Sequence, residues 1–426
     1  MKFIAILLIL GQILMAATIE HIELKGIKIP VIFENDKRLP LVTMQFVFTN
    51  SGSISDTDKA GLAKFSAKMM GEGTQELGSS AFAEALDSKA IHISSSTGSE
   101  TFVMEMSCLK EQFDEGLNFF NMLLKNPNIS DEALKNVKTK TIGSLTSKEN
   151  DFDYVASNEL KALMFKGSVF ENPSSGTVES VESIKLSDVE KFIKSHLVSS
   201  RLIIVIGGDI NLKDAKVKIA KIVNEMPKGK SSKIINYKPS AEIKTSILKR
   251  ETEQAYIYFG SPYHMDVDSE DYYKARVATY ILGTGGFGSR LMEEIRVKRG
   301  LAYSAYARVH VSKSRSYFNG YLQTKLDSLD EARKTVNDVI ATFVKNGVTK
   351  EELEQTKKFL LGSEPLRVET MSQRLSRTFM EYYKGKELGY SAKELKLIKN
   401  LKLKDLNKFI KKHSEINNLS YAIVTK

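Results

Sequence analysis

The chain has little of several features that mark whole classes of protein. Its 426 residues include one cysteine, Cys108, so no disulfide can form within the chain. Cys108 lies in an alternating stretch, and we interpret it as a small buried apolar residue with no function. Only 8 prolines are present and 42% of the residues are hydrophobic, which excludes collagen-like and disordered chains.

Closely spaced histidines are also missing. No two of the six histidines lie within five residues of each other, which excludes the H-E-x-x-H and H-x-x-E-H patterns that hold zinc on one helical face. These six are His21, His92, His196, His264, His310 and His413. A zinc site built from scattered histidines stays open as a minor alternative.

Long apolar runs are confined to the N-terminus. Lys2 precedes an apolar run, residues 3–15, which is followed by the small pair Ala16-Ala17. This order predicts a secretory signal peptide over residues 1–17, with an uncleaved anchor as the alternative. No other segment approaches the length of a membrane span, so we expect no stable membrane insertion after the signal is removed.

The chain carries an excess of positive charge, but its basic residues are not gathered in one segment. The formal net charge is +10, yet lysines alternate with acidic residues, as in residues 345–358. This pattern favours a solvated basic surface, and we expect no nucleic-acid partner.

An internal repeat organises the chain. The segment Ile184–His196 is echoed by Leu401–His413, 217 residues later. Each copy is predicted to form a helix opened by an N-cap, and a strand follows each, at residues 202–206 and 419–424.

The fronts of the two halves also match. Residues 41–48 and 255–260 are predicted strands, and they lead into apolar helices over residues 60–70 and 273–282.

These patterns predict an α+β protein of two tandem homologous domains, each a mostly antiparallel sheet with helices packed on one face. The domains are assigned to residues 18–225 and 245–426, and the polar, turn-rich residues 226–244 form the linker.

A glycine-rich segment needs its own interpretation. Gly283, Gly285 and Gly288 form G-x-G-x-x-G, which in dinucleotide-binding proteins follows a buried strand. Here a predicted helix precedes it, and Arg308 and His310 occupy the window where an acidic residue is needed. We therefore expect the glycines to join two helices and to leave backbone accessible to a peptide.

The following segment places two hydrogen-bond donors near one junction between a helix and a strand. Arg296 ends a predicted helix, and Tyr303 starts a strand after Gly300. Together they could hold a peptide carbonyl or stabilise an oxyanion. The alternative is structural, with the arginine capping the helix and the tyrosine packed in the sheet.

At this point the chain resembles a known family. The segment Gly288–Tyr303 is similar to the C-terminal-domain signature of the insulinase/pitrilysin peptidases, the group that includes mitochondrial processing peptidase. The resemblance extends over nearly the whole mature chain. It implies that Arg296 and Tyr303, seven residues apart, bind the substrate next to the scissile bond.

The family's zinc motif has degenerated in this chain. The resemblance aligns Lys64 and Lys68 with the two histidine ligands, Ala67 with the glutamate that activates water, and Ser144 with the third ligand. A protonated ammonium has no lone pair to give and repels a divalent cation. We therefore expect no metal or other cofactor on this chain and no hydrolysis by it alone.

Two further segments resemble parts of the family that hold peptide. Residues 92–104, which include Ser94 and Ser95, are similar to the edge strand on which an extended peptide adds as a further strand. The turn that contains Gly285 and Gly286 is similar to the family's inner-wall loop.

Some members of the family are heterodimers in which one subunit carries zinc and the other supplies the arginine and tyrosine. The resemblance therefore implies a non-catalytic periplasmic subunit that pairs with a zinc-bearing homologous peptidase and encloses an unfolded peptide. The rival hypothesis is a peptide-binding or scaffold protein with no proteolytic partner. An independently active peptidase with a different site is the third.

Overall fold

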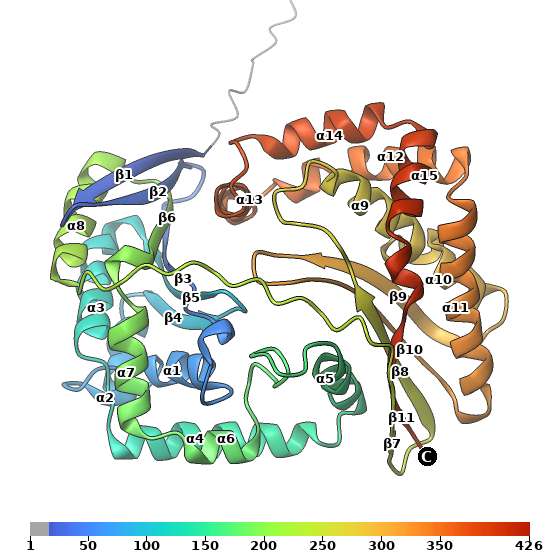
Figure 1. Ribbon diagram of the computed structural model, residues 1–426. Coiled ribbons are helices and arrows are strands. Elements are labelled where there is room, and N and C mark those ends of the chain that lie inside the picture. Colours follow the sequence, from blue (N-terminus) through green and yellow to red (C-terminus); the bar gives the residue numbers. More distant parts are fainter. Residues whose placement is uncertain (1–16) are drawn as a thin grey trace, which may run out of the picture.

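The computed structural model describes residues 17–426, so the predicted signal segment lies outside the described residues except for Ala17. Two α+β halves stand side by side, the first coloured blue to green and the second yellow to red in Figure 1.

The first half is built on a six-stranded sheet. Its strands are β1 (Thr18–Leu24), β2 (Ile27–Asn35), β3 (Leu41–Thr49), β4 (His92–Thr97), β5 (Thr101–Leu109) and β6 (Leu202–Gly208). They lie in the order β1-β2-β6-β3-β5-β4, and only β2 and β6 run parallel. Its helices are α1 (Leu62–Met70), α2 (Gly78–Asp87), α3 (Phe113–Lys125), α4 (Asp131–Lys148), α5 (Phe152–Met164), α6 (Val178–Ser183), α7 (Leu186–His196) and α8 (Leu212–Glu225).

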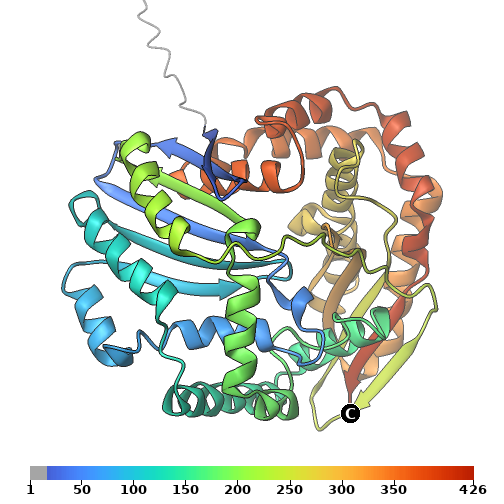
Figure 2. The same ribbon diagram turned by 60° about the vertical axis from the view of Figure 1, so that its left-hand side comes forward.

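Alternation along the strands decides which side of this sheet is covered. In β5 every second side chain is buried, among them Phe102, Met106 and Cys108, because successive side chains point to opposite faces of a strand. These side chains pack with Leu117 and Phe120 of α3. Figure 2 shows α3 and α8 lying over the sheet on this side. Cys108 is buried, as predicted.

The second half repeats this arrangement. Its strands are β7 (Thr245–Lys249), β8 (Gln254–Pro262), β9 (Ala302–Val311), β10 (Ser316–Lys325) and β11 (Ser420–Thr425). Their order, β7-β11-β8-β10-β9, is that of β2-β6-β3-β5-β4, and again only the first pair is parallel. Its helices are α9 (Tyr272–Thr279), α10 (Arg290–Met292), α11 (Leu329–Asn346), α12 (Lys350–Gly362), α13 (Met371–Tyr383), α14 (Tyr390–Asn400) and α15 (Leu403–Lys412). The predicted fold of two tandem, mostly antiparallel α+β units is confirmed.

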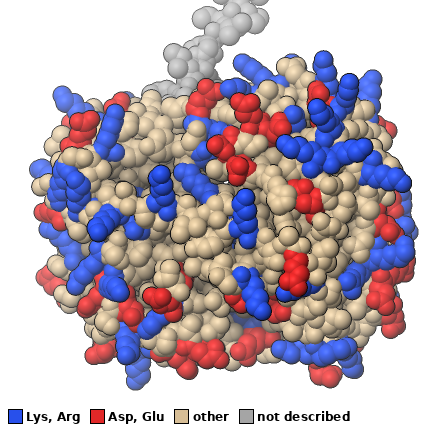
Figure 3. Space-filling model, in the orientation of Figure 1, with Lys and Arg blue, Asp and Glu red and all other residues tan. Residues whose placement is uncertain are grey.

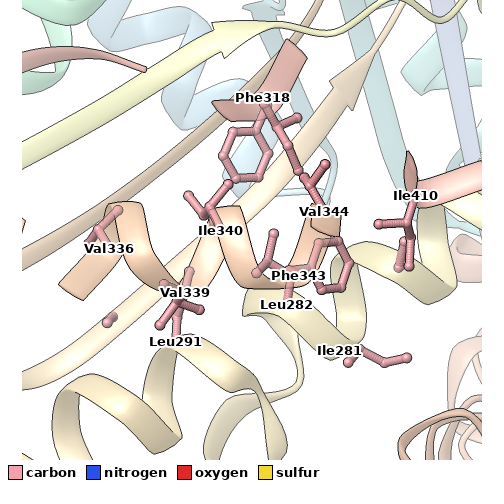
Figure 4. Packing of buried hydrophobic residues seen from close by; sticks show 14 of the residues in the cluster. Ile281, Leu282, Leu291, Phe318, Val336, Val339, Ile340, Phe343, Val344 and Ile410 are labelled. Atoms are coloured by element: carbon pink, nitrogen blue, oxygen red, sulfur yellow. The ribbon is translucent and has the colours of Figure 1, made fainter. Parts of the chain in front are cut away.

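The core of the second half lies between its sheet and α11. Figure 4 shows Phe318 of β10 above Ile340 and Val344 of α11, with Leu291 of α10 below the same helix. All four side chains are at most 7% exposed. This core holds in place the segment before α11. That segment contains Arg296 and Tyr303, the predicted substrate-binding residues.

Each half also contributes one helix that packs against the sheet of the other half. Helix α5 of the first half packs on β8 and β11, and α13 of the second half packs on β2 and β6. Polar contacts accompany the packing: Tyr258 donates to Asp153 at 3.1 Å, and Tyr383 donates to buried Glu100 at 2.7 Å. The exchange joins the two halves into one packed unit.

The residues between the halves are extended. Residues 226–244 contain no helix or strand and cross the face seen in Figure 1. The division into domains at residues 18–225 and 245–426 stays a prediction. Figure 3 shows basic and acidic side chains interspersed over this face. Across residues 17–426, no helix is both long and apolar enough to cross a membrane.

The N-cap residues of the two repeat helices are lysines. The helices of the repeat, α7 and α15, begin after Lys185 and Lys402, and neither lysine makes a side-chain capping bond. In α7 the Asp188 carboxylate accepts the Lys185 backbone N–H at 2.7 Å instead. An acidic residue in the first turn of α7 therefore accepts from the backbone of the N-cap residue, as in one half of a capping box.

Candidate functional site

Arg296 and Tyr303 lie against each other. Arg296 belongs to a π-helical segment, Glu293–Val297, that continues α10, and Tyr303 is the second residue of β9. The Cζ atom of Arg296 lies 4.3 Å from the centroid of the Tyr303 ring and 4.6 Å from that of Phe287. The guanidinium is thus in cation–π contact with two aromatic rings.

This stack of Phe287, Arg296 and Tyr303 is open to solvent. Tyr303 is 82% exposed and Phe287 is 63% exposed. Neither Arg296 nor Tyr303 hydrogen-bonds through its side chain to another described residue, so the guanidinium and phenol donors remain available. Tyr303 is therefore not packed in the sheet as the structural alternative required, whereas Arg296 does lie in the last turn of its helical segment.

A β-bulge sets the direction of Tyr303. Ala302 pairs with Thr324 and Ala305 pairs with Leu322, which leaves Tyr303 and Ser304 opposite Gln323 alone. An extra residue in one strand bends it and redirects its side chains. The bulge therefore accounts for an exposed tyrosine between buried Ala302 and buried Ala305.

The glycine-rich turn supports the same stack. A π-helical segment, Tyr280–Thr284, leads into it, so no strand precedes the G-x-G-x-x-G pattern, and the turn joins two helical segments as expected. A Cβ atom at Gly283 would lie 2.4 Å from the backbone nitrogen of Ala307 in β9, so only glycine fits this approach. Gly286 has a φ of +60°, and Gly285 before it is half-buried. The turn then presents Phe287 to Arg296.

The residues that the resemblance aligns with zinc positions lie on and beside α1. Lys64 and Lys68 are four residues apart and so share one face of the helix. Lys64 Nζ donates to Ser175 Oγ at 3.0 Å, and Lys68 Nζ donates to Thr141 Oγ1 of α4 at 2.8 Å. Ala67 faces the core and is 4% exposed.

Ser144, the predicted counterpart of the third ligand, is exposed on α4, and Thr141 one turn earlier makes the contact with α1.

The electrostatics of this place do not suit a cation. Burial lowers the pKa of the Lys64 and Lys68 ammonium groups, and the nearby charge of Lys148 lowers both further. Among residues 17–426, no group of three or more His, Cys, Asp or Glu side chains is arranged to hold a metal ion. The residues present therefore do not fit zinc.

Strand β4 is an edge strand, as the resemblance implied. In the described sheet it pairs only with β5, and its side chains alternate between exposed and half-buried. Ser94 is exposed, whereas Ser95 is half-buried. Helix α1 packs beside β4, so Ser94 and Ser95 lie close to the helix that carries Lys64 and Lys68.

The predicted site residues thus fall into two groups. Lys64, Lys68 and β4 belong to the first half, and the stack with its glycine turn belongs to the second. Sequence reasoning missed Phe287, although an exposed aromatic residue inside a glycine-rich turn was an available signal. It also missed Lys148, which lies seven residues beyond Thr141 and hence on the same face of α4.

Comparison with known proteins identifies the family and agrees with the fold. Residues 31–178 match the family described as insulinase (peptidase family M16), and residues 183–360 match the peptidase M16 inactive domain. A Helicobacter pylori protein named "Non-peptidase homolog YmxG" is 40% identical over 427 residues, which span the whole chain and 99% of that protein.

Solved structures share the same architecture. A peptidase M16 inactive domain from Pseudomonas fluorescens superposes with a TM-score of 0.88 at 22% identity, over 96% of this chain and 97% of that one. A protease from Helicobacter pylori gives a TM-score of 0.84 at 15% identity, over 96% and 100%. At these identities the two structures support the fold alone.

Proposed function

Because the chain belongs to the insulinase family of peptidases, peptidase family M16, we propose that it is the non-catalytic subunit of a periplasmic zinc-peptidase heterodimer. It supplies Arg296, Tyr303 and half of the chamber that holds an unfolded peptide. The zinc-bearing homologous subunit supplies the metal and the water-activating carboxylate.

The single observation that carries this proposal is the contrast between the two groups of site residues. The zinc positions hold two lysines and a buried alanine, which can neither bind zinc nor activate water. The stack of Phe287, Arg296 and Tyr303 is exposed and has free donors, although burying these aromatic rings would favour folding. Exposed aromatic side chains of this kind favour a binding role.

The stack suits a peptide backbone. The guanidinium presents a planar set of N–H donors, and its contact with two rings limits its rotation. The phenol of Tyr303 adds an O–H donor at the same corner. Two donors that converge on one carbonyl would position it and stabilise the negative charge that develops on its oxygen during hydrolysis.

The periplasmic location rests on the signal-like segment over residues 1–17. Secretion across the inner membrane would bring the mature chain, residues 18–426, to the compartment where it meets its partner and peptide substrates.

The test is cleavage of a quenched fluorescent peptide library by this chain, by a zinc-bearing relative from the same cell, and by the two mixed. We expect cleavage to appear, or to rise at least tenfold, only in the mixture. Tyr303→Phe keeps the ring and removes the donor, so it should lower kcat by about 100-fold if the phenol stabilises the oxyanion. Arg299→Gln, in the same segment but outside the stack, is the matched control and should leave activity unchanged.

The rival function predicts a different result. If the two proteins do not co-elute and mixing leaves cleavage unchanged, the heterodimer proposal fails. Peptide binding by this chain alone would then favour the peptide-binding or scaffold protein.

A further inference from the structure

We propose that the former zinc position is an anion site that selects acidic peptides, in which Lys64 and Lys68 bind carboxylate side chains of an extended segment lying along β4. The inference rests on the proposed function in one respect, namely that the ligand of the chamber is a peptide. The new element is the chemical class of that peptide, which carries carboxylate side chains.

The first observation is a convergence of three ammonium groups. Lys64 and Lys68 share a face of α1, and the Lys68 contact with Thr141 brings that face against α4. Lys148 lies two turns beyond Thr141 on the same face of α4. Its Nζ atom stands 4.9 Å from the centroid of the Tyr154 ring, which holds the side chain at the start of α5.

The second observation is that these charges are not compensated. Within residues 17–426 no carboxylate forms an ion pair with Lys64, Lys68 or Lys148. Other lysines in the same region do have such partners: Lys59 pairs with Asp188 at 2.5 Å, and Lys140 pairs with Glu72 at 3.5 Å.

Lys64 and Lys68 instead donate to two hydroxyl groups, which are neutral. Burial and the charges of neighbouring lysines lower the pKa of both ammonium groups and so disfavour their charged forms. A bound carboxylate would offset both effects through charge-assisted hydrogen bonds.

The third observation is the match in spacing. Four residues along α1 separate Lys64 from Lys68, which is a rise of about 6 Å. In an extended peptide, side chains on the same face recur every two residues, or about 6.6 Å. Two acidic side chains at alternate positions of one strand would therefore meet the two lysines.

The strand that would carry such a peptide lies beside α1. The outer edge of β4 has no strand partner in the described sheet, and α1 packs against β4. A peptide that adds to this edge receives backbone hydrogen bonds from β4, and its alternate side chains can face α1. Backbone pairing would then supply affinity, and the lysines would supply selection for acidic sequences.

The test uses this chain alone, so its outcome does not depend on a zinc-bearing partner. Binding is measured by fluorescence anisotropy with a labelled extended peptide that carries Glu at two alternate positions, and with a peptide of the same sequence carrying Gln there. The variants are Lys64→Gln/Lys68→Gln and, to restore charge, Lys64→Arg/Lys68→Arg. The matched control is Lys404→Gln/Lys408→Gln, an exposed pair with the same spacing on α15.

We expect the Glu peptide to bind about tenfold or more tightly than the Gln peptide, as one charge-assisted hydrogen bond would provide. The Lys→Gln pair should abolish this preference, the Lys→Arg pair should keep most of it, and the α15 control should leave it unchanged. Equal binding of the two peptides, or a preference that survives Lys64→Gln/Lys68→Gln, would overturn the proposal. Inorganic phosphate that binds the lysines while the peptides do not discriminate would overturn it as well, because the site would then accept small anions only.

Discussion

Replacing Arg374 by glutamine is expected to loosen the contact between the two halves of the chain. Arg374 lies on α13 and reaches the first half, where its Nε donates to Glu34 at 2.6 Å and its Nη2 donates to Asp36 at 2.8 Å. The Glu34 side chain is 3% exposed and that of Arg374 is 16% exposed. This ion pair is therefore almost fully removed from solvent.

The substitution destabilises the folded protein mainly through Glu34, which stays buried and loses its ion-pair partner. Burial raises the pKa of this carboxyl group although Arg374 lowers it, and its second oxygen, Oε2, is buried without a hydrogen-bond partner. Asp36 keeps Arg38, whose guanidinium is the main reason that the pKa of Asp36 falls to about 2. Removing one partner of a buried ion pair costs about 3–5 kcal/mol, because the remaining charge stays buried.

The assay is urea unfolding followed by circular dichroism, with Arg377→Gln as the matched control. Arg377 lies on the same helix but pairs with Glu364 inside the second half, and its side chain is 25% exposed. Its loss should cost about 1 kcal/mol. Small-angle scattering should show a larger radius of gyration for Arg374→Gln than for Arg377→Gln, because only Arg374 joins the halves.

The pH dependence gives an internal check. Without Arg374 the folded-state pKa of Glu34 rises further above its ordinary value of 4.5. A raised folded pKa gives stability that is present at low pH and is lost as the pH rises through that pKa. The deficit of Arg374→Gln should therefore grow from pH 4 to pH 7. Equal losses for the two variants, or a deficit that does not change with pH, would refute this account.

Two further outcomes are expected. Burial raises the pKa of Asp56, before α1, from 3.8 to about 7 despite two backbone hydrogen bonds, so the stability that its protonation provides is lost between about pH 4 and pH 7. In Asp56→Asn, the change in unfolding free energy between pH 4 and pH 7 should be smaller by up to about 4 kcal/mol, measured by unfolding at several pH values. If the variant and the unsubstituted protein show the same change, the pKa of Asp56 is not raised. Gly283→Ala should destabilise the protein by about 1–3 kcal/mol, because its Cβ would lie 2.4 Å from the Ala307 backbone. Gly288→Ala, which meets no atom within 4 Å, is the control, and equal thermal midpoints would reject the clash.

The sequence predicted the duplication well because the repeat consists of local patterns. The segment at 184–196 and its copy at 401–413 form α7 and α15, and each is followed by an interior strand that pairs in parallel with one neighbour. Helical periodicity and an apolar run suffice to recognise such elements. The lysines aligned with zinc positions came from the resemblance to the family and not from these patterns, and residue type alone then sufficed to argue that they cannot bind the metal.

Other features depend on geometry that residue spacing does not carry. The exchange of α5 and α13 between the halves is a contact between segments far apart in sequence, and their periodicity only shows that each has an apolar face. The bulge at Tyr303 and the π-helical segment that contains Arg296 follow from how β9 and α10 meet, not from the seven-residue spacing. The place of Phe287 in a glycine-rich turn could have drawn notice, but its contact with Arg296 crosses that turn and follows from geometry alone.

The replacement of ligands by lysines changes chemistry more than it changes charge. A zinc site presents a divalent cation to the substrate, and Lys64, Lys68 and Lys148 present three ammonium groups at the same place. Both arrangements attract carboxylates and carbonyl oxygens, but an ammonium group does not lower the pKa of a bound water to near neutrality. On the proposed function, these lysines would keep the sign of the local field and would supply no nucleophile. A peptide along β4 would be held and oriented without being cut, which is the property that a substrate-binding subunit requires.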